Sequence, residues 1–122
     1  MKQSGNKILI TGGGSGIGLG LAGRFIQDGN TVIICGRREA VLQEASAQYP
    51  ALITKTCDLS DEQARIALYD WVATNHSDVN VLVNNAGIQQ WMDIGDADFY
   101  PRAKAEITTN IEAPVHLTAL FS

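Results

Sequence analysis

The feature that most restricts the fold is a glycine-rich segment between a short apolar run and a helical pattern. Five of the seven residues from 12 to 18 are glycine, whereas a simple turn needs one or two. Glycine lets the backbone approach a ligand closely. The helix N-terminus that follows offers free N–H groups and a positive dipole end. This order of elements is typical of a phosphate-binding turn in an α/β fold.

The spacing of the glycines narrows the kind of turn. Gly12, Gly16 and Gly18 give the pattern GxxxGxG, which differs from the GxGxxG of many dinucleotide-binding proteins. No Gly-Lys-Ser/Thr follows, so a P-loop is disfavoured. The alternative interpretation is a glycine-rich turn that binds no ligand.

Short β-branched runs alternate with longer stretches of helical spacing along the whole chain. This alternation is typical of βαβ units and predicts a parallel sheet. The third predicted strand is the weakest, because its centre is Thr-Lys-Thr. The four predicted strands are Lys7–Thr11, Thr31–Cys35, Leu52–Cys57 and Val79–Val83.

Two helices are predicted between the first three strands. Ile17, Leu21 and Phe25 recur at intervals of four residues, and Gly29 supplies a C-terminal stop. The second helix is predicted over residues 38–48. Its inward-facing residues are expected to be Leu42, Ala45 and Tyr49.

Two further helices are predicted after the third and fourth strands. Ser60, followed three residues later by Gln63, forms a capping box that predicts the start of the third helix. The last helix is expected to begin at Pro101, after an irregular stretch, and to run to the end of the chain. The predicted buried face of the third helix is Ala64, Ala67, Leu68, Trp71 and Val72, and the apolar stripe of the last is Ile107, Ile111, Val115 and Ala119.

Length and charge exclude several classes of protein. The 122 residues fit one domain, and the net charge of −4 makes nucleic acid an unsuitable partner. The apolar run Ile8 to Ile10 is too short for a signal-peptide core or a membrane span. We therefore expect a cytoplasmic protein with no membrane association.

Cysteine and histidine are too sparse to suggest a metal site. Cys35 and Cys57 lack CxxC spacing and each ends an apolar run, which predicts reduced, buried thiols. His76 and His116 have no clustered ligands around them, so we predict no metal.

Four motifs together resemble the short-chain dehydrogenase/reductase family. Residues 11–18, TGGGSGIG, are similar to its TGxxxGxG motif. Asp58 matches its adenine-contacting Asp, residues 84–87 match its NNAG motif, and Asn110 matches its active-site Asn. Within the family, residues 79–89 most resemble Gram-positive oxidoreductases of the lipoteichoic-acid D-alanylation operon type.

The resemblance implies a Rossmann-type α/β fold for residues 1–122, as the NADP(H)-binding N-terminal half of the family's fold. We expect a three-layer αβα sandwich with a truncated parallel sheet of strand order 3-2-1-4. The cofactor is expected over the carboxyl ends of the first and fourth strands, at the switch point. The expected cofactor-binding residues are Thr11, Gly12, Gly14, Ser15, Gly16, Ile17, Gly18, Arg37, Arg38, Asp58, Leu59, Asn85, Ala86 and Gly87.

Each residue carried over from the family also has a purely structural interpretation. Asp58 could cap or turn the chain before Ser60. Asn84 and Asn85 could form a polar turn while also lining the cofactor site. Asn110 interrupts the apolar side of a helix, where a short amide competes with backbone bonding, so a role in the site is favoured there.

The end of the second strand favours NADP over NAD. NAD-binding folds place an acid there to hold the ribose 2′-hydroxyl. This sequence has Cys-Gly-Arg-Arg at 35–38, with no acid before Glu39. Arg37 and Arg38 would start a helix, where the dipole disfavours positive charge unless a 2′-phosphate is bound. The family's second basic position is Ser15 here, which departs from the pattern.

The family's Ser and its YxxxK motif lie beyond the region that this sequence covers. Tyr100 and Lys104 have YxxxK spacing, but they precede Asn110 with no strand between. Pro101 also disfavours helical geometry at Tyr100, so we interpret the match as accidental.

The resemblance predicts an NADP(H)-dependent oxidoreductase that acts on a small carbonyl or alcohol and forms homo-oligomers. Asn110 would be the only catalytic residue present, so the 122 residues alone are predicted to be inactive. Self-association is expected, because the fourth strand would be a bare sheet edge and Leu117, Leu120 and Phe121 would lack packing partners. The rival hypothesis is a non-catalytic NADP-binding sensor or structural module.

Overall fold

The computed structural model of the chain describes residues 2–12, 14, 16–86, 95 and 97–122. Within these residues one parallel sheet has four strands in the order β3-β2-β1-β4. Its strands are β1 (Lys7–Thr11), β2 (Thr31–Gly36), β3 (Ile53–Thr56) and β4 (Val81–Asn84). The predicted parallel sheet and its strand order are confirmed.

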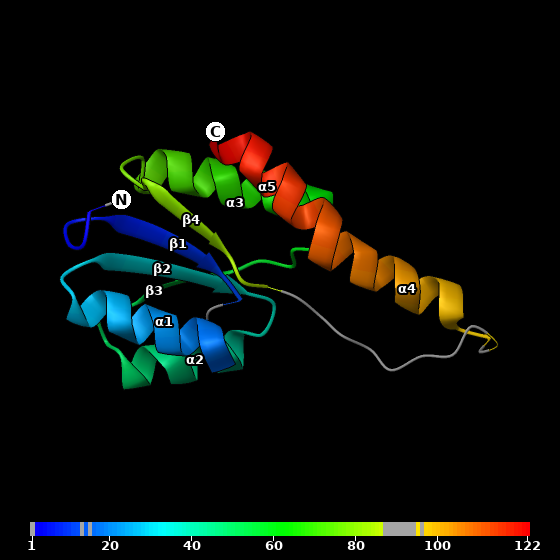
Figure 1. The fold of residues 1–122 in the computed structure, drawn as a ribbon, viewed down its shortest axis with the longest axis horizontal. Coiled ribbons are helices and arrows are strands. Elements are labelled where there is room, and N and C mark those ends of the chain that lie inside the picture. Colours follow the sequence, from blue (N-terminus) through cyan, green and yellow to red (C-terminus); the bar gives the residue numbers. More distant parts are fainter. Residues whose placement is uncertain (1, 13, 15, 87–94, 96) are drawn as a thin grey trace.

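Helices cover both faces of the sheet, which gives the predicted αβα sandwich (Figure 1). Helices α1 and α2 lie on one face, and α3 and α5 lie on the other. Helix α4, a π-helical turn η1 and α5 follow one another without a break, and α4 extends away from the sheet. The helical bounds are α1 (Gly16–Gln27), α2 (Glu39–Gln48), α3 (Glu62–Asn75), α4 (Phe99–Ile107), η1 (Thr108–Glu112) and α5 (Ala113–Phe121).

The core is divided in two by the sheet. Successive side chains of a strand point to opposite faces, so Ile8 and Ile10 pack toward α1 and α2 whereas Leu9 packs toward α3 and α5. All three side chains are fully buried. The central strands are therefore apolar on both faces, as is typical of parallel sheets.

The predicted ends of the strands differ from the observed ends by one or two residues. Leu52 donates its N–H to the Tyr49 carbonyl oxygen, and Val79 donates its N–H to the His76 carbonyl oxygen. Both bonds close turns that leave the preceding helix, so β3 and β4 begin after them. The apolar character of Leu52 and Val79 reflects packing against the core at these turns.

The predicted capping box at the start of α3 is wrong. The N-cap is Asp61, whose side chain accepts a hydrogen bond from the Gln63 N–H. The Ser60 hydroxyl instead donates to Asp58, so it is not available to cap the helix. Asp is as good an N-cap as Ser, and the helix begins one residue later than the Ser60 pattern implied.

The predicted buried face of α3 is wrong at one position. Ala67 is exposed, whereas Arg65 is fully buried. Leu68 and Val72 are buried as predicted, with Ala64 and Trp71 packed against the same cluster. A buried arginine breaks the apolar pattern, which is why the sequence did not reveal it.

The last helical segment begins earlier than predicted. Helix α4 starts at Phe99, so Tyr100 is helical and lies one turn from Lys104. Pro101 lies in the first turn, where a missing N–H costs no helical hydrogen bond. The argument that Pro101 keeps Tyr100 out of a helix is therefore wrong.

The packing of α5 also differs from the prediction. Leu117 is 1% exposed, and Leu120 and Phe121 pack against the same core cluster. The ring of Phe121 meets that of Tyr69 edge to face, with 5.2 Å between the ring centres. The large apolar residues that stay exposed in η1, in α5 and at the end of α4 are Ile107, Ile111 and Val115. The face without a packing partner is therefore opposite to the one predicted.

No helix in the described part of the chain is both long enough and apolar enough to cross a bilayer.

We predict that Leu117→Ala lowers the free energy of unfolding by about 2–5 kcal/mol, because it removes a fully buried side chain between α5 and the sheet. Thr118→Ala, at the next and exposed position, should change it by about 0.5 kcal/mol or less. Urea denaturation followed by circular dichroism measures both. Equal effects of the two substitutions would show that α5 does not pack as described.

Candidate nucleotide-binding site

A cavity of about 470 Å³ lies where the carboxyl ends of the strands meet. Parallel α/β sheets bind ligands at this edge, near the point where the strand order reverses. Here β1 lies between β2 and β4, so that point falls beside the glycine-rich turn. The lining residues are Gly12, Gly14, Gly36, Arg37, Arg38, Val41, Leu42, Cys57, Asp58, Leu59, Ser60, Asn85, Ala86, Ala105 and Thr109.

The start of the glycine-rich turn is fixed by the end of β4. The Thr11 hydroxyl accepts the N–H groups of Asn85 and Ala86, each at 3.0 Å, and donates to the Val83 carbonyl oxygen at 3.4 Å. The Asn85 side chain donates to the Gly12 carbonyl oxygen at 3.2 Å. These bonds hold the two segments side by side at the floor of the cavity.

Glycine is required at position 12 on two grounds. Its φ is +68°, in the region that side chains rarely adopt. A Cβ there would also lie 2.8 Å from the Cα of Ala86, and backbone cannot move aside cheaply. Gly12 therefore allows the turn to approach the end of β4 as closely as it does.

Gly14 and Gly16 differ in what surrounds them. A Cβ on Gly14 would lie 2.9 Å from Cγ1 of Val41 on α2. Gly16 has a φ of +60° and begins α1, with nothing within 4 Å of a Cβ placed there. The N-terminus of α1 thus adjoins the turn, which is the arrangement that binds phosphate oxygens through backbone N–H groups.

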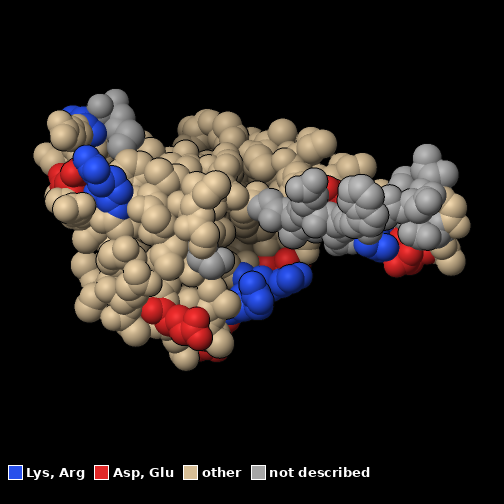
Figure 2. All heavy atoms as spheres, turned by 60° about the horizontal axis from the view of Figure 1, so that its bottom comes forward, with Lys and Arg blue, Asp and Glu red and all other residues tan. Residues whose placement is uncertain are grey.

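Two arginines stand at the junction of β2 and α2. Arg38 occupies the N-cap position of α2 but makes no side-chain capping bond, and Arg37 precedes it. Both are exposed and both line the cavity. Figure 2 shows a group of basic side chains where the main body meets the projecting C-terminal segment. Positive charge beside a helix N-terminus favours a bound anion.

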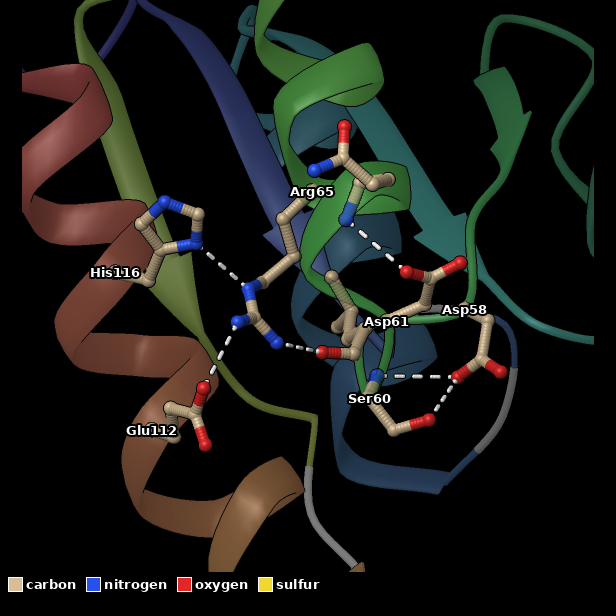
Figure 3. Close-up of polar contacts among 8 residues, drawn as sticks. Asp58, Ser60, Asp61, Arg65, Glu112 and His116 are labelled. Carbon is tan, nitrogen blue, oxygen red and sulfur yellow. Dashed lines mark hydrogen bonds and ion pairs between the residues drawn. The ribbon is translucent and has the colours of Figure 1, made fainter.

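Asp58 is held by a tight turn that follows β3, the strand that pairs with β2. Its Oδ1 accepts from the Ser60 hydroxyl at 2.6 Å and from the Ser60 N–H at 3.0 Å (Figure 3). The hydroxyl bond is the main reason that the pKa of Asp58 lies below its ordinary value, and the charge of Arg37 lowers it further. Asp58 is therefore an oriented carboxylate at neutral pH, so the turn interpretation holds without excluding a role in binding.

The two cysteines are free and buried, as predicted. Burial raises the pKa of Cys35 to about 12 and is also the main cause that raises the pKa of Cys57 to about 11. Both are therefore neutral thiols at physiological pH, and Cys57 contributes an apolar surface to the cavity.

Of the residues predicted to bind a cofactor and described in the structure, eight line the cavity and four do not. Thr11 and Gly18 are buried beneath it, Gly16 begins α1, and Ile17 is 80% exposed with its side chain in solvent. Ser15 and Gly87 lie outside the described residues. The eight are Gly12, Gly14, Arg37, Arg38, Asp58, Leu59, Asn85 and Ala86.

Asn110, the predicted catalytic residue, lies on the π-helical turn η1. It is exposed and lines a separate cavity of about 290 Å³ on the α4 and η1 surface. Its neighbour Thr109 lines the larger cavity. Single π-helical turns occur frequently at functional sites, which agrees with the interruption that Asn110 makes in the apolar pattern.

Sequence reasoning missed several lining residues because they belong to ordinary structural patterns. Val41 and Leu42 look like core positions of a helix, and Ser60 looked like a helix cap. Their only signal is proximity in sequence to Arg37, Arg38 and Asp58. The remaining lining residues that were not predicted are Gly36, Cys57, Ala105 and Thr109.

Comparison with known proteins shows to which family the chain belongs. The model of the short chain dehydrogenase family matches residues 6–122, which is nearly the whole chain. The chain belongs to the short-chain dehydrogenase family.

Relatives within the short-chain dehydrogenase family agree with this assignment. The "Uncharacterized oxidoreductase DltE" of Bacillus subtilis (strain 168) is 51% identical over 124 residues, which cover 100% of this chain and 49% of that protein. "Dehydrogenase/reductase SDR family member 11" of Homo sapiens is 35% identical over 86 residues, which cover 66% of this chain and 33% of that protein. The chain spans about half the length of DltE, and DltE confirms the narrower resemblance seen at residues 79–89.

Solved structures of the family have the same fold. A short chain dehydrogenase/reductase family protein is 32% identical with a TM-score of 0.83, over 99% of this chain and 50% of that one. The 3-ketoacyl-(acyl-carrier-protein) reductase of Brucella melitensis, in complex with NADH, is 29% identical with a TM-score of 0.81, over 97% of this chain and 49% of that one.

We predict opposite effects for two glycine-to-alanine substitutions. Gly12→Ala should lower the free energy of unfolding by about 1–3 kcal/mol, because it forces a strained φ and a contact with the Ala86 backbone. Gly20→Ala, in the interior of α1 with open space around it, should raise it by about 0.5–1 kcal/mol. Thermal and urea unfolding measure both. A stabilising Gly12→Ala would contradict the described approach of the turn to β4.

Proposed function

We propose that residues 1–122 form the NADP(H)-binding unit of a short-chain oxidoreductase. The observation that carries the proposal is the cavity that joins a bare glycine turn to Arg37 and Arg38. The chain has a net charge of −4, so a polyphosphate must be held by a local site of this kind. The family relationship supplies the class of cofactor, and the two arginines supply the preference for NADP over NAD.

The residues of the cavity fit such a cofactor. Gly12 and Gly14 both line the cavity, so backbone without side chains faces the space where a pyrophosphate would bind. Arg37 and Arg38 would hold the 2′-phosphate, because guanidinium groups bind phosphate through paired N–H donors. Asp58 would accept from the adenine, and Asn85 and Ala86 would line the side of the cavity at the end of β4.

The proposed reaction is hydride transfer between NADP(H) and a small carbonyl or alcohol. Bound NADPH supplies the hydride to the carbonyl carbon. The protein must bind and orient the substrate and donate a proton to its oxygen. Asn110 is the residue of this chain that matches a catalytic position of the family, where the amide holds a water of the proton relay. The proton-donating Tyr, its Lys and the Ser that holds the carbonyl oxygen are not supplied by residues 1–122.

The exposed apolar face of α4, η1 and α5 supports a homo-oligomer. Ile107, Ile111 and Val115 lie at intervals of four residues and are more than half exposed. Their spacing makes one continuous stripe along the segment from α4 to α5, and of this segment it is α5 that packs on the sheet with its other face. A second copy of the chain would bury this stripe, and β4 is also an unpaired sheet edge among the described strands. A cytoplasmic location remains a prediction, supported by the free thiols.

We predict that Arg37→Asp weakens NADPH binding by about ten- to a hundredfold, because it removes a charge-assisted hydrogen bond to the 2′-phosphate. Binding of NADH should change much less. Arg24→Asp makes the same change in charge on α1, outside the cavity, and serves as the control. Titration of intrinsic tryptophan fluorescence measures the affinities. Equal affinity of the unchanged protein for NADH and NADPH would refute the proposal, and so would an affinity for NADPH that Arg37→Asp leaves unaltered.

We predict that the 122 residues alone catalyse no NADPH oxidation with a panel of aldehydes and ketones. General acid catalysis needs a donor within about 3 Å of the reacting oxygen. Tyr100 is 63% exposed, and neither it nor Lys104 lines the larger cavity. Absorbance of NADPH follows the reaction. Turnover that disappears in Tyr100→Phe and Lys104→Ala would show that this pair is the active site.

We predict that the protein self-associates at tens of micromolar and that Ile111→Glu shifts it toward the monomer. A charge placed in the middle of an apolar interface is left unpaired and desolvated. Ala73→Glu adds the same charge to an exposed position of α3 and should leave the association unchanged. Light scattering measures the mass. A 13.1 kDa monomer for the unchanged chain would contradict the prediction.

A further inference from the structure

Arg65 is the most deeply buried charged side chain in the described part of the protein, with 1% of its surface exposed. It lies on the first turns of α3, facing the inner surface of α5. A guanidinium stays protonated in proteins, so its burial costs several kcal/mol unless acceptors surround it. The structure supplies such acceptors from three separate places.

The three acceptors come from different elements of the fold (Figure 3). Nη1 of Arg65 donates to the Leu59 carbonyl oxygen at 2.7 Å, and Nε donates to Nδ1 of His116 at 2.8 Å. Nη2 donates to the Glu112 carboxylate at 3.4 Å. Leu59 precedes α3, His116 lies on α5 and Glu112 ends η1, so one side chain joins all three segments.

The Leu59 carbonyl is the point at which Arg65 reaches the cofactor cavity. Asp58, Leu59 and Ser60 are consecutive lining residues that form one wall. The turn between Asp58 and Ser60 fixes the ends of this wall, and the bond from Arg65 fixes its centre. A group that does not itself line the cavity therefore holds the backbone next to Asp58.

The other two bonds connect this wall to the C-terminal helices. Glu112 belongs to the same five-residue turn as Thr109, which also lines the cavity. His116 stands one helical turn beyond Glu112. Arg65 thus sets the position of the Asp58 wall relative to the turn that carries Thr109 and Asn110.

Stability alone does not explain an arginine at this position. A well-packed apolar side chain in place of a buried ion pair is often neutral or stabilising. A leucine or methionine, however, could not bond three acceptors at once. Lysine has one compact charged group and lacks the planar fork, so it could not reach acceptors on three segments either.

We propose that Arg65 is a positioning residue for the cofactor site. Its three bonds fix the position of residues 58–60 relative to the η1 turn. This inference rests on the proposed NADP(H) function and extends it to a residue that touches no cofactor. The part of the ligand that depends on Arg65 is the adenosine half, because Asp58 and its neighbours line that side. His116 takes part as a neutral acceptor through Nδ1, which requires its proton to be on Nε2.

The test uses adenosine 2′,5′-bisphosphate, which carries the adenine and the 2′-phosphate but no nicotinamide. Isothermal titration with the purified protein gives its dissociation constant. We expect Arg65→Met and Arg65→Lys each to weaken binding by roughly tenfold, the effect expected if a displaced Asp58 carboxylate loses one charge-assisted hydrogen bond to the ligand. Val72→Ala removes a buried side chain of α3 that does not line the cavity. It should lower the melting temperature but leave the dissociation constant within about twofold.

Two substitutions of His116 provide an independent measurement. His116→Asn keeps an acceptor oxygen near the place of Nδ1, and His116→Leu removes the acceptor. The His116→Asn variant should bind the bisphosphate about as well as the unchanged protein does. The His116→Leu variant should bind it several-fold more weakly. This pair decides the question if Arg65→Met does not fold, because neither variant removes the buried charge.

The outcomes separate this inference from the proposed function. If the unchanged protein binds neither NADPH nor the bisphosphate, the proposed function fails, and the role of Arg65 in it fails with it. If the unchanged protein binds both but binding is the same in Arg65→Met and in the two His116 variants, only the positioning role is overturned. Loss of affinity in Val72→Ala equal to that in Arg65→Met would also overturn it, since general destabilisation would then explain both.

Discussion

The Thr11 hydroxyl holds together the part of the structure on which the site depends. It accepts two backbone N–H groups from the segment after β4 and donates to the Val83 carbonyl oxygen. These bonds draw the end of β1 and the end of β4 together, and Gly12 fits only because it has no Cβ. The glycine turn, the floor of the cavity and the N-terminus of α1 all follow from this contact.

Around that contact, the site combines groups that favour a negatively charged ligand. The N-terminus of α1 and the two arginines after β2 supply positive potential within a protein whose net charge is −4. Asp58, after the neighbouring strand β3, adds an oriented carboxylate, with its pKa held below the ordinary value mainly by the Ser60 hydroxyl. A cavity that offers both cationic groups and an oriented carboxylate suits a ligand that carries phosphates as well as hydrogen-bond donors.

The sequence predicted the parts of this structure that depend on local pattern. The β-branched runs gave the four strands, and the glycine spacing placed the turn between β1 and α1. The start of α3 was misplaced because Ser60 and Asp61 are both good caps, and only the bond from Ser60 to Asp58 decides between them. The spacing of residues in the sequence does not show which of two adjacent capping residues forms the capping bond.

The errors at the C-terminal helices arise from tertiary packing. Arg65 breaks an apolar face and would be taken for an exposed residue, yet acceptors from three distant segments bury it. Leu117 and Val115 are both apolar and only two residues apart, and the sheet decides which of them faces inward. Pro101 predicts a helix start at its own position, but the helix begins at Phe99, because a proline in the first turn interrupts no helical hydrogen bond.

We propose that the cavity at the carboxyl ends of the strands holds NADP(H) through the glycine turn, Arg37 and the Asp58 wall. An amide NMR titration of the protein with NADPH tests it directly, because each backbone N–H reports its own surroundings. The account predicts that the largest shifts fall on Gly12, Gly14 and residues 37–38 and 58–60. Shifts confined to the small cavity beside Asn110, or spread evenly with none at the glycine turn, would contradict it.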